Sequence, residues 1–502
     1  LPLGSRVILR RLASLSLSAS LLWAQPLDLL RVEKPEPLAG LNLTRISEQS
    51  IRAHLDYLAA PERQGRGLGT KGIEAAVAYI EQSLRASGLQ PSSQKVPLRR
   101  VENLKGTLEL RFRGKRLSWI HGKDALFGEL NPDQLAAQAV FAGYGISEPS
   151  SGHDDFAGLD VKGKVVFFRA GMPESLQKAH PELVSRYDSP KLNDRYEARI
   201  AKLDRLGAVG AVALEESLEA APPQKVYYRS RPEGKATQEP FLIRAQWKAD
   251  MERLPALVTL RLWVNAQVKQ VSSRNVLAVL KGRSDGGEAV LMGAHYDHLG
   301  MPGGVVHPGA DDNASGVSAL LEIAHLMASA TPPRRTVIFA FWTGEEDGKF
   351  GSGHYVRHPH CPLARTRAYV NLDMIGHAWT QADLKALAEE GQQTLESPFF
   401  KGLDPRHFAE LGYSDDAPWM REVLLGAGSA SGMSLRLDPG NGRWGGSDYR
   451  DFAWASVPWV RFFGSFFPDY HQPGDRPEAL DASQVQRMAR LACATAWLLA
   501  ER

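Results

Sequence analysis

Apolar and polar residues follow different periods in different parts of the chain. Residues 46–60 and 72–89 carry apolar side chains at three- and four-residue spacing, which predicts two amphipathic helices, the second ending at Gly88. Between them, residues 67–72 match the spacing of a dinucleotide-binding fingerprint. Because this glycine-rich stretch follows a helix rather than a strand, we interpret it as a turn.

The pattern changes between residues 95 and 265. Short β-like runs predominate there, at 107–114, 138–146 and 164–171, with one helical segment at 195–214. Proline-rich stretches separate these runs. We therefore expect a smaller β-rich module, inserted into a larger domain whose N-terminal part is residues 46–94.

Residues 266–502 show a third pattern. Continuous apolar runs predict strands buried on both faces, and they lie at 275–282, 288–297, 334–346 and 367–376. A helical pattern at 313–329 separates two of them. Alternating strands and helices indicate an α/β layered domain.

The first 24 residues have the order of a secretory signal peptide. Arg6, Arg10 and Arg11 precede an apolar run that ends at the small residue Ala24, and the run is short for a membrane-spanning helix. We expect a linker at 25–45 and a secreted or periplasmic protein that has no membrane association after signal removal.

Composition narrows the function classes. The 60 basic and 57 acidic residues give a net charge of +3, without the clustered basic surface that nucleic-acid binding requires. Cys361 and Cys493 are the two cysteines, and one pair is no disulfide framework. A disulfide and two buried thiols are both compatible with the sequence, which predicts no oligomeric state.

Polar residues with metal-binding chemistry follow the predicted strands. His295 and Asp297 follow one strand, Glu345 and Glu346 the next, and Asp373 a third. Ligands of open α/β sheets bind at the carboxyl ends of strands. Together with an aspartate of "HPGADDNASGV" and with His471, these residues form an oxygen and nitrogen ligand set that suits zinc without thiolates.

Spacing suggests roles for the neighbouring residues. Asp311 or Asp312, at a helix start, is placed to bridge two ions, the alternative being a helix cap. Asp297 and Asp475 lie two and four residues after His295 and His471, where they could orient the imidazoles. In the pair Glu345–Glu346, one carboxylate can ligate while the other takes a proton from water.

These motifs resemble metallopeptidase family 28, which includes leucyl aminopeptidases and glutamate carboxypeptidases. The resemblance rests on "GAHYDHLG", "GADDNASGV", "FWTGEEDGKFGS", "YVNLDMIG" and "PDYHQPGD" in this order. "VFAGYGI" and "DDFAGLDVKGKVVFFRAG" resemble a protease-associated insert. The resemblance implies a three-layer αβα sandwich with a mixed, mostly parallel central sheet, residues 266–502 being the catalytic domain.

The resemblance also implies a ligand set for two Zn²⁺ ions. Asp311 would bridge them, with the peptide bond after it in the cis form. The other expected ligands are His295 and Asp373 for one ion, and Glu346 and His471 for the other. Glu345 would be the general base, with Asp297 in a supporting catalytic role, and Tyr470 would steady the tetrahedral intermediate.

Other candidate sites are less consistent with the sequence. His298 could replace His295 as a ligand. His354 and His358, with His360 and Cys361, lack the glutamate of a zinc-protease helix and favour a solvated helix end. Asp448 is interpreted as structural or supporting.

We expect an exported di-zinc exopeptidase acting on peptides, most consistent with an aminopeptidase. The alternatives are a glutamate-releasing carboxypeptidase, for which Arg443 and Arg461 could hold the substrate carboxylate, and a non-catalytic binding protein on the same fold.

Overall fold

The computed structural model describes residues 27–127, 134–188, 192–218, 227–230, 240–249, 251, 258–284, 286–443 and 445–502. The expected signal peptide, residues 1–24, lies outside this part of the chain. Among the described helices, none is long and apolar enough to cross a membrane.

A mixed sheet forms the centre of the larger module. Its strand order is β1-β17-β16-β18-β15-β13-β14-β12. Strands β15, β13 and β14 are mutually parallel neighbours, and β18 continues this parallel set beside β15. The bounds are β1 Asp28–Leu30, β12 Val258–Leu280, β13 Ala289–His295, β14 Thr336–Trp342, β15 Thr366–Leu372, β16 Phe408–Ser414, β17 Ser434–Gly440 and β18 Trp459–Phe463.

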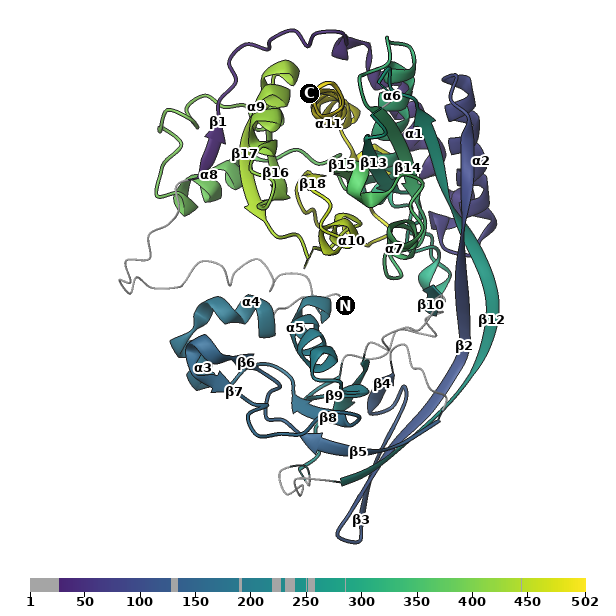
Figure 1. Cartoon of the computed structure of the whole chain (residues 1–502), viewed down its shortest axis with the longest axis vertical. Coiled ribbons are helices and arrows are strands. Elements are labelled where there is room, and N and C mark those ends of the chain that lie inside the picture. Colours follow the sequence, from purple (N-terminus) through teal and green to yellow (C-terminus); the bar gives the residue numbers. More distant parts are fainter. Residues whose placement is uncertain are drawn as a thin grey trace, which may run out of the picture.

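Helices cover both faces of this sheet, so the module has three layers (Figure 1). Successive residues of β13 show why. Met292 packs into the core formed with α1, α2, α6, α9 and α11, whereas Leu291 faces the core formed with α7 and α10. The helices are α1 Glu48–Leu58, α2 Lys71–Ala86, α6 Gly316–Ala328, α7 Phe350–Arg357, α8 Gln381–Glu390, α9 Met420–Ser431, α10 Tyr449–Trp454 and α11 Ala482–Glu501.

Two long antiparallel strands join this module to a second one. Strand β2, Pro91–Phe112, pairs with β12 from Pro91 opposite Ala278 to Arg111 opposite Thr259. The pair runs along one side of the molecule from the larger module to the smaller one (Figure 1). The module boundaries expected at residues 95 and 265 therefore lie within continuous strands.

The second module consists mainly of strands and contains three helices, where the sequence predicts one helical segment. Strands β5, β8, β9 and β11 lie side by side in this order and are parallel to one another, and β4 pairs antiparallel with β11 at the edge. The bounds are β3 Lys115–Ile120, β4 Ala125–Phe127, β5 Gln134–Phe141, β6 Ser147–Glu148, β7 His153–Asp154, β8 Val165–Arg169, β9 Gly210–Glu215, β10 Tyr227–Ser230, β11 Phe241–Gln246, α3 Glu174–Ala179, α4 Val184–Tyr187 and α5 Leu192–Arg205.

Residues 195–214 differ from the expectation of one helical segment. Helix α5 ends at Arg205, and Gly207 adopts a left-handed backbone with φ +74°. The apolar run that follows becomes β9, whose six residues are all buried between two parallel neighbours. Small apolar residues suit a helix and a buried parallel strand equally, so the period alone does not separate the two.

Within the larger module, the expected elements form where the pattern places them. The four predicted strands are the end of β12, then β13, β14 and β15, and the predicted helix between two of them is α6. The expected linker differs, since Asp28–Leu30 within it pairs with β17 as an edge strand. Cys361 and Cys493 are free thiols, Cys493 being buried.

The packing of β13 gives a test of this core. We expect Met292→Ala, in a fully buried position, to lower the free energy of unfolding by about 2–5 kcal/mol because it leaves a cavity. Met301, with 41% exposure, is the matched control, and Met301→Ala should change it by less than about 0.5 kcal/mol. Chemical denaturation measures both, and equal losses would contradict the described core.

Candidate metal centre

The candidate ligands meet because their strands are parallel neighbours. His295 is the last residue of β13, Asp373 follows the end of β15, and Glu345 and Glu346 follow the end of β14. All three strands end at the same edge of the sheet. The side chains that follow them therefore share one volume, as the sequence predicts.

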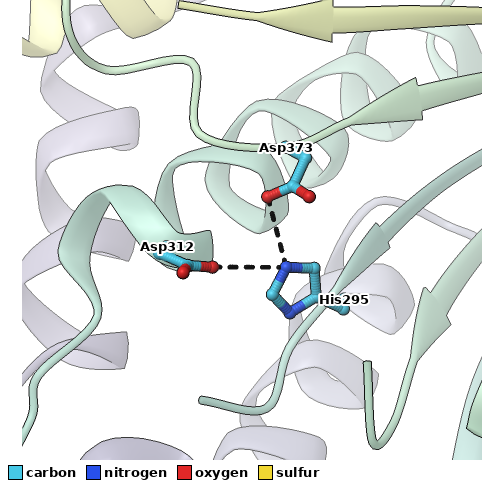
Figure 2. A group of neighbouring side chains, drawn as sticks. All are labelled: His295, Asp312 and Asp373. Atoms are coloured by element: carbon cyan, nitrogen blue, oxygen red, sulfur yellow. Dashed lines mark hydrogen bonds and ion pairs between the residues drawn. The ribbon is translucent and has the colours of Figure 1, made fainter. Parts of the chain in front are cut away.

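The first group contains His295, Asp312 and Asp373 (Figure 2). The Nε2 atom of His295 lies 3.2 Å from Oδ1 of Asp373 and 3.4 Å from Oδ1 of Asp312. Two ligand atoms bound to one zinc ion at tetrahedral angles lie about 3.4 Å apart, given bond lengths near 2.0–2.2 Å. These separations fit one ion.

The second group contains His298, Asp312 and Glu346. Nδ1 of His298 lies 2.5 Å from Oε1 of Glu346 and 3.8 Å from Oδ2 of Asp312. His471 approaches the same carboxylates, its Nε2 atom lying 3.0 Å from Asp312 and 3.2 Å from Glu346. Asp312 thus belongs to both groups, each through a different oxygen.

The structure places Asp312, and not Asp311, between the two groups. Asp311 is buried, but its carboxylate accepts hydrogen bonds from the Gly376 amide at 2.6 Å and from Nδ1 of His377 at 2.7 Å. The cis peptide bond lies correspondingly one residue later than expected, between Asp312 and Asn313. Adjacent side chains in this turn point in different directions, and the sequence motif does not show which aspartate faces the ligands.

The turn that carries Asp312 has a specific backbone. Residues Ala310–Ser315 form it just before α6, and Gly309 precedes it with φ +62°. A Cβ atom at Gly309 would lie 2.2 Å from the Asp312 carbonyl oxygen, so only glycine fits. Asp475 accepts hydrogen bonds from the amides of Asp311 at 2.8 Å and Asp312 at 3.1 Å. Asp475 therefore holds this turn instead of orienting the imidazole of His471.

Asp297 likewise orients a main chain. Its carboxylate accepts hydrogen bonds from the amides of Glu345 at 3.1 Å and Glu346 at 3.3 Å. Its distance to Nδ1 of His295 is 3.9 Å, and that nitrogen lies closer to the Asp297 carbonyl oxygen, at 3.3 Å. The orienting partner of His295 is therefore this carbonyl rather than the carboxylate expected from the sequence.

Glu345 lies beside the two groups without belonging to either. Its carboxylate is paired with Nζ of Lys349 at 2.9 Å, both side chains being nearly buried. Burial raises the pKa of Glu345, and the positive charge of Lys349 opposes that rise. A carboxylate held beside metal ligands, with its proton affinity raised, has the properties of a general base.

His471 and the carboxylates around it shift each other's pKa. Burial lowers the pKa of His471, but its hydrogen bonds to Asp312 and Glu346 outweigh burial and raise this pKa to about 10. Burial and Asp312 raise the pKa of Glu346, yet the interactions with His298 and His471 bring it to about 2. A metal ion bound here would take the place of the proton on His471.

Other residues named from the sequence lie in or near the site. The Tyr470 ring stacks on the His471 ring with centroids 3.9 Å apart. Asp448 is buried close to Glu345, whose charge adds to the effect of burial and raises the pKa of Asp448 well above its usual range. The rings of His354 and His358 lie in contact in a tilted arrangement, with centroids 4.4 Å apart, and neither residue belongs to a candidate metal group among the described residues.

The donor set fits zinc. The two groups offer imidazole nitrogens and carboxylate oxygens without a thiolate, and within each group the ligand atoms lie within 4.8 Å of one another. His298 is the member that the sequence motif identified only as a substitute for His295, although "HYDHLG" contains both histidines. His298 is 2% exposed, and its Nδ1 atom contacts the carboxylate of Glu346 in the second group.

Comparison with known proteins is consistent with this geometry. Residues 275–496 match the model of peptidase family M28. The chain is 25% identical over 454 residues to a probable lipoprotein aminopeptidase, LpqL, of Mycobacterium tuberculosis, covering 88% of this chain and 82% of that protein. It is 28% identical over 259 residues to aminopeptidase YwaD of Bacillus subtilis, covering half of each chain.

Among solved structures, the fold is similar to that of an aminopeptidase from Aneurinibacillus sp. strain AM-1. The TM-score is 0.56 at 19% identity, covering 91% of this chain and 95% of that one. This likeness shows the fold alone.

The pair of Glu345 and Lys349 gives a test of the site's electrostatics. Lys349→Met should lower the free energy of unfolding by about 3–5 kcal/mol, because it leaves a buried carboxylate without its cation. The exposed pair of Lys385 and Glu389 has the same four-residue spacing, and Lys385→Met should cost less than about 0.5 kcal/mol. Denaturant titration of the zinc-loaded protein measures both, and a neutral Lys349→Met would contradict the pairing.

Proposed function

We propose that this chain, whose residues 275–496 match the model of peptidase family M28, is an exported di-zinc aminopeptidase of that family. The observation that carries this proposal is the sharing of Asp312 by two groups of ligands, with the separate carboxylate of Glu345 beside them. Export is supported by the N-terminal sequence and by the name of the lipoprotein relative.

The proposed ligand sets follow the geometry. His295, Asp312 and Asp373 would hold one zinc ion, and Asp312, Glu346 and His471 the other, with His298 of the second group as a further nitrogen donor. When bound, the two ions supply Lewis acidity at the scissile carbonyl and lower the pKa of water. Asp297 and Asp475 keep the ligand-bearing main chains in place through their paired amide contacts.

Glu345 performs the proton transfer in this proposal. Its carboxylate takes the proton of the attacking water and passes it to the nitrogen of the leaving amine. The ion pair with Lys349 holds the Glu345 side chain in position. Glu346, in contrast, belongs to the second ligand group, so the two adjacent glutamates have different roles. Tyr470, whose ring stacks on that of His471, would donate a hydrogen bond to the tetrahedral intermediate.

Cleavage at the amino end of a peptide is the proposed activity, in preference to cleavage at the carboxyl end. A glutamate-releasing carboxypeptidase needs arginines available for the substrate carboxylate. Arg461 is paired with Glu410 at 3.4 Å and with Asp438 at 3.9 Å. Arg443 lies over the ring of Trp454, 5.5 Å from its centroid. Both arginines named as candidates therefore already have partners.

Glu345 provides the first test of this function. Glu345→Gln should lower kcat for aminoacyl substrates with a free amine by at least about 100-fold, because a general base is lost while the side chain keeps its size. Glu389, exposed on α8, is the matched control, and Glu389→Gln should leave kcat unchanged.

The same assay includes N-blocked peptides. Hydrolysis of blocked but not free-amine peptides would favour the carboxypeptidase, and hydrolysis of neither by zinc-loaded protein would favour a non-catalytic binding protein. Normal turnover by Glu345→Gln would contradict its role as the base.

The two adjacent aspartates test the bridging role. Asp312→Asn should abolish stable binding of both zinc ions, because it removes the negative charge that both groups share and replaces one of the two carboxylate oxygens with an NH2 group that cannot bind a metal ion. Asp311→Asn keeps an amide oxygen for the Gly376 amide and should retain both ions. Metal analysis after dialysis measures the zinc per chain, and loss of zinc by Asp311→Asn alone would reverse the assignment.

A further inference from the structure

Arg66 is a fully buried charged residue that the proposed reaction does not use. It lies at the end of the turn Pro61–Arg66, between α1 and α2, with φ +48°. Among the described residues, no carboxylate forms an ion pair with it within 4.0 Å. A guanidinium placed so deeply without a carboxylate partner needs other acceptors, since an unpaired buried charge is very costly.

Main-chain carbonyl groups supply those acceptors. Nε donates to the Tyr296 carbonyl at 2.8 Å. Nη1 donates to the carbonyls of Leu58 at 2.8 Å and Pro308 at 2.7 Å. Nη2 donates to the carbonyl of Gly309 at 2.7 Å and, more weakly, to that of Asp312 at 3.4 Å. The five contacts match the five N–H donors of arginine.

The acceptors belong to the segments that carry the candidate ligands. Tyr296 stands between His295 and Asp297, at the end of β13. Pro308 and Gly309 lead into the turn of Asp312, and the fifth acceptor is the carbonyl of Asp312 itself. The carbonyl of Arg66 in turn accepts a hydrogen bond from the His298 amide at 3.4 Å.

We propose that Arg66 is a positioning residue of the metal centre. Its planar guanidinium connects the main chain after β13 to the main chain before α6 and so sets the distance between His295 and Asp312. This inference rests on the proposed zinc binding at those residues. The positive charge also lies near Asp312, Asp297 and Glu346, where it offsets part of their mutual repulsion.

Lysine cannot reproduce these contacts. An ammonium group has three donors at a single point, whereas the carbonyls of Arg66 lie around a flat fork and come from three chain segments. Charge and position can therefore be separated by substitution. Arg66→Lys keeps the charge and loses the bridging geometry, and Arg66→Met loses both.

The chain contains a matched control in the second module. Arg199 is also fully buried, and its guanidinium donates to carbonyl groups of Tyr144, Tyr187, Arg195 and Gly171. None of these carbonyls belongs to a segment that carries a candidate ligand. Arg199→Met therefore removes an equivalent buried guanidinium without touching the metal centre.

The test measures zinc affinity of the full chain by titration with a competing zinc indicator, alongside circular dichroism to establish folding. Arg66→Met and Arg66→Lys should each weaken zinc binding about 10- to 100-fold, the range seen when groups that orient ligands are removed. Arg199→Met should bind zinc as tightly as the unaltered chain. Where Arg66→Met does not fold, Arg66→Lys carries the test.

Two results would overturn the proposal. One is unaltered zinc affinity in folded Arg66→Lys, which would assign any loss in Arg66→Met to the missing charge. The other is an equal loss in Arg66→Met and Arg199→Met, which would indicate a general effect of lost stability. Failure of the proposed function is distinguishable, because the unaltered chain itself would then bind no zinc.

Discussion

Several carboxylates occupy one buried volume at the edge of the central sheet, and this electrostatic constraint organises the site. Asp312, Glu345 and Glu346 are nearly buried, and Asp373 lies beside them. Negative charges that share one buried volume repel each other strongly, because water is excluded. Cationic groups must therefore be close, and the structure provides imidazoles, Lys349 and the guanidinium of Arg66. Metal ions between the carboxylates would meet the same requirement with greater charge.

At two places in the site, a buried aspartate accepts hydrogen bonds from the main-chain amides of two adjacent acidic residues. Asp297 accepts the amides of Glu345 and Glu346, and Asp475 accepts those of Asp311 and Asp312. In each case one buried aspartate fixes a pair of adjacent acidic residues, of which one joins a ligand group. The other member of each pair has a separate partner, Lys349 for Glu345 and the Gly376 amide for Asp311. In each pair, therefore, one carboxylate belongs to a candidate ligand group and the other is held by a different partner.

Sequence patterns predicted much of this arrangement. The apolar runs before His295, Glu345 and Asp373 became parallel neighbouring strands, so residues distant in the sequence meet at one edge. The pattern could not assign the direction of adjacent side chains, and the residue common to the two candidate groups is therefore Asp312 where Asp311 was expected. Asp475 was expected beside His471, yet it contacts a turn 163 residues earlier in the chain. Arg66 had no signal, because its partners are carbonyl groups that every residue possesses.

The second module shows the same limit of sequence patterns. Its short apolar runs predicted strands, and these formed, but three helices, α3, α4 and α5, accompany them where one helical segment was expected. Helix α5 and strand β9 share one apolar stretch, separated only by the turn at Gly207. Its identity as a protease-associated insert stays a prediction from motif resemblance. The continuous strands β2 and β12 link this module to the sheet that carries the candidate metal ligands.

The central claim is that Asp312 is shared by two zinc ions. Crystals of the zinc-loaded protein, with anomalous diffraction recorded on both sides of the zinc absorption edge, test it most directly. Two anomalous peaks about 3.5–4 Å apart are expected, each at bonding distance from a different carboxylate oxygen of Asp312. A single peak, or two peaks bridged by Asp311, would contradict it.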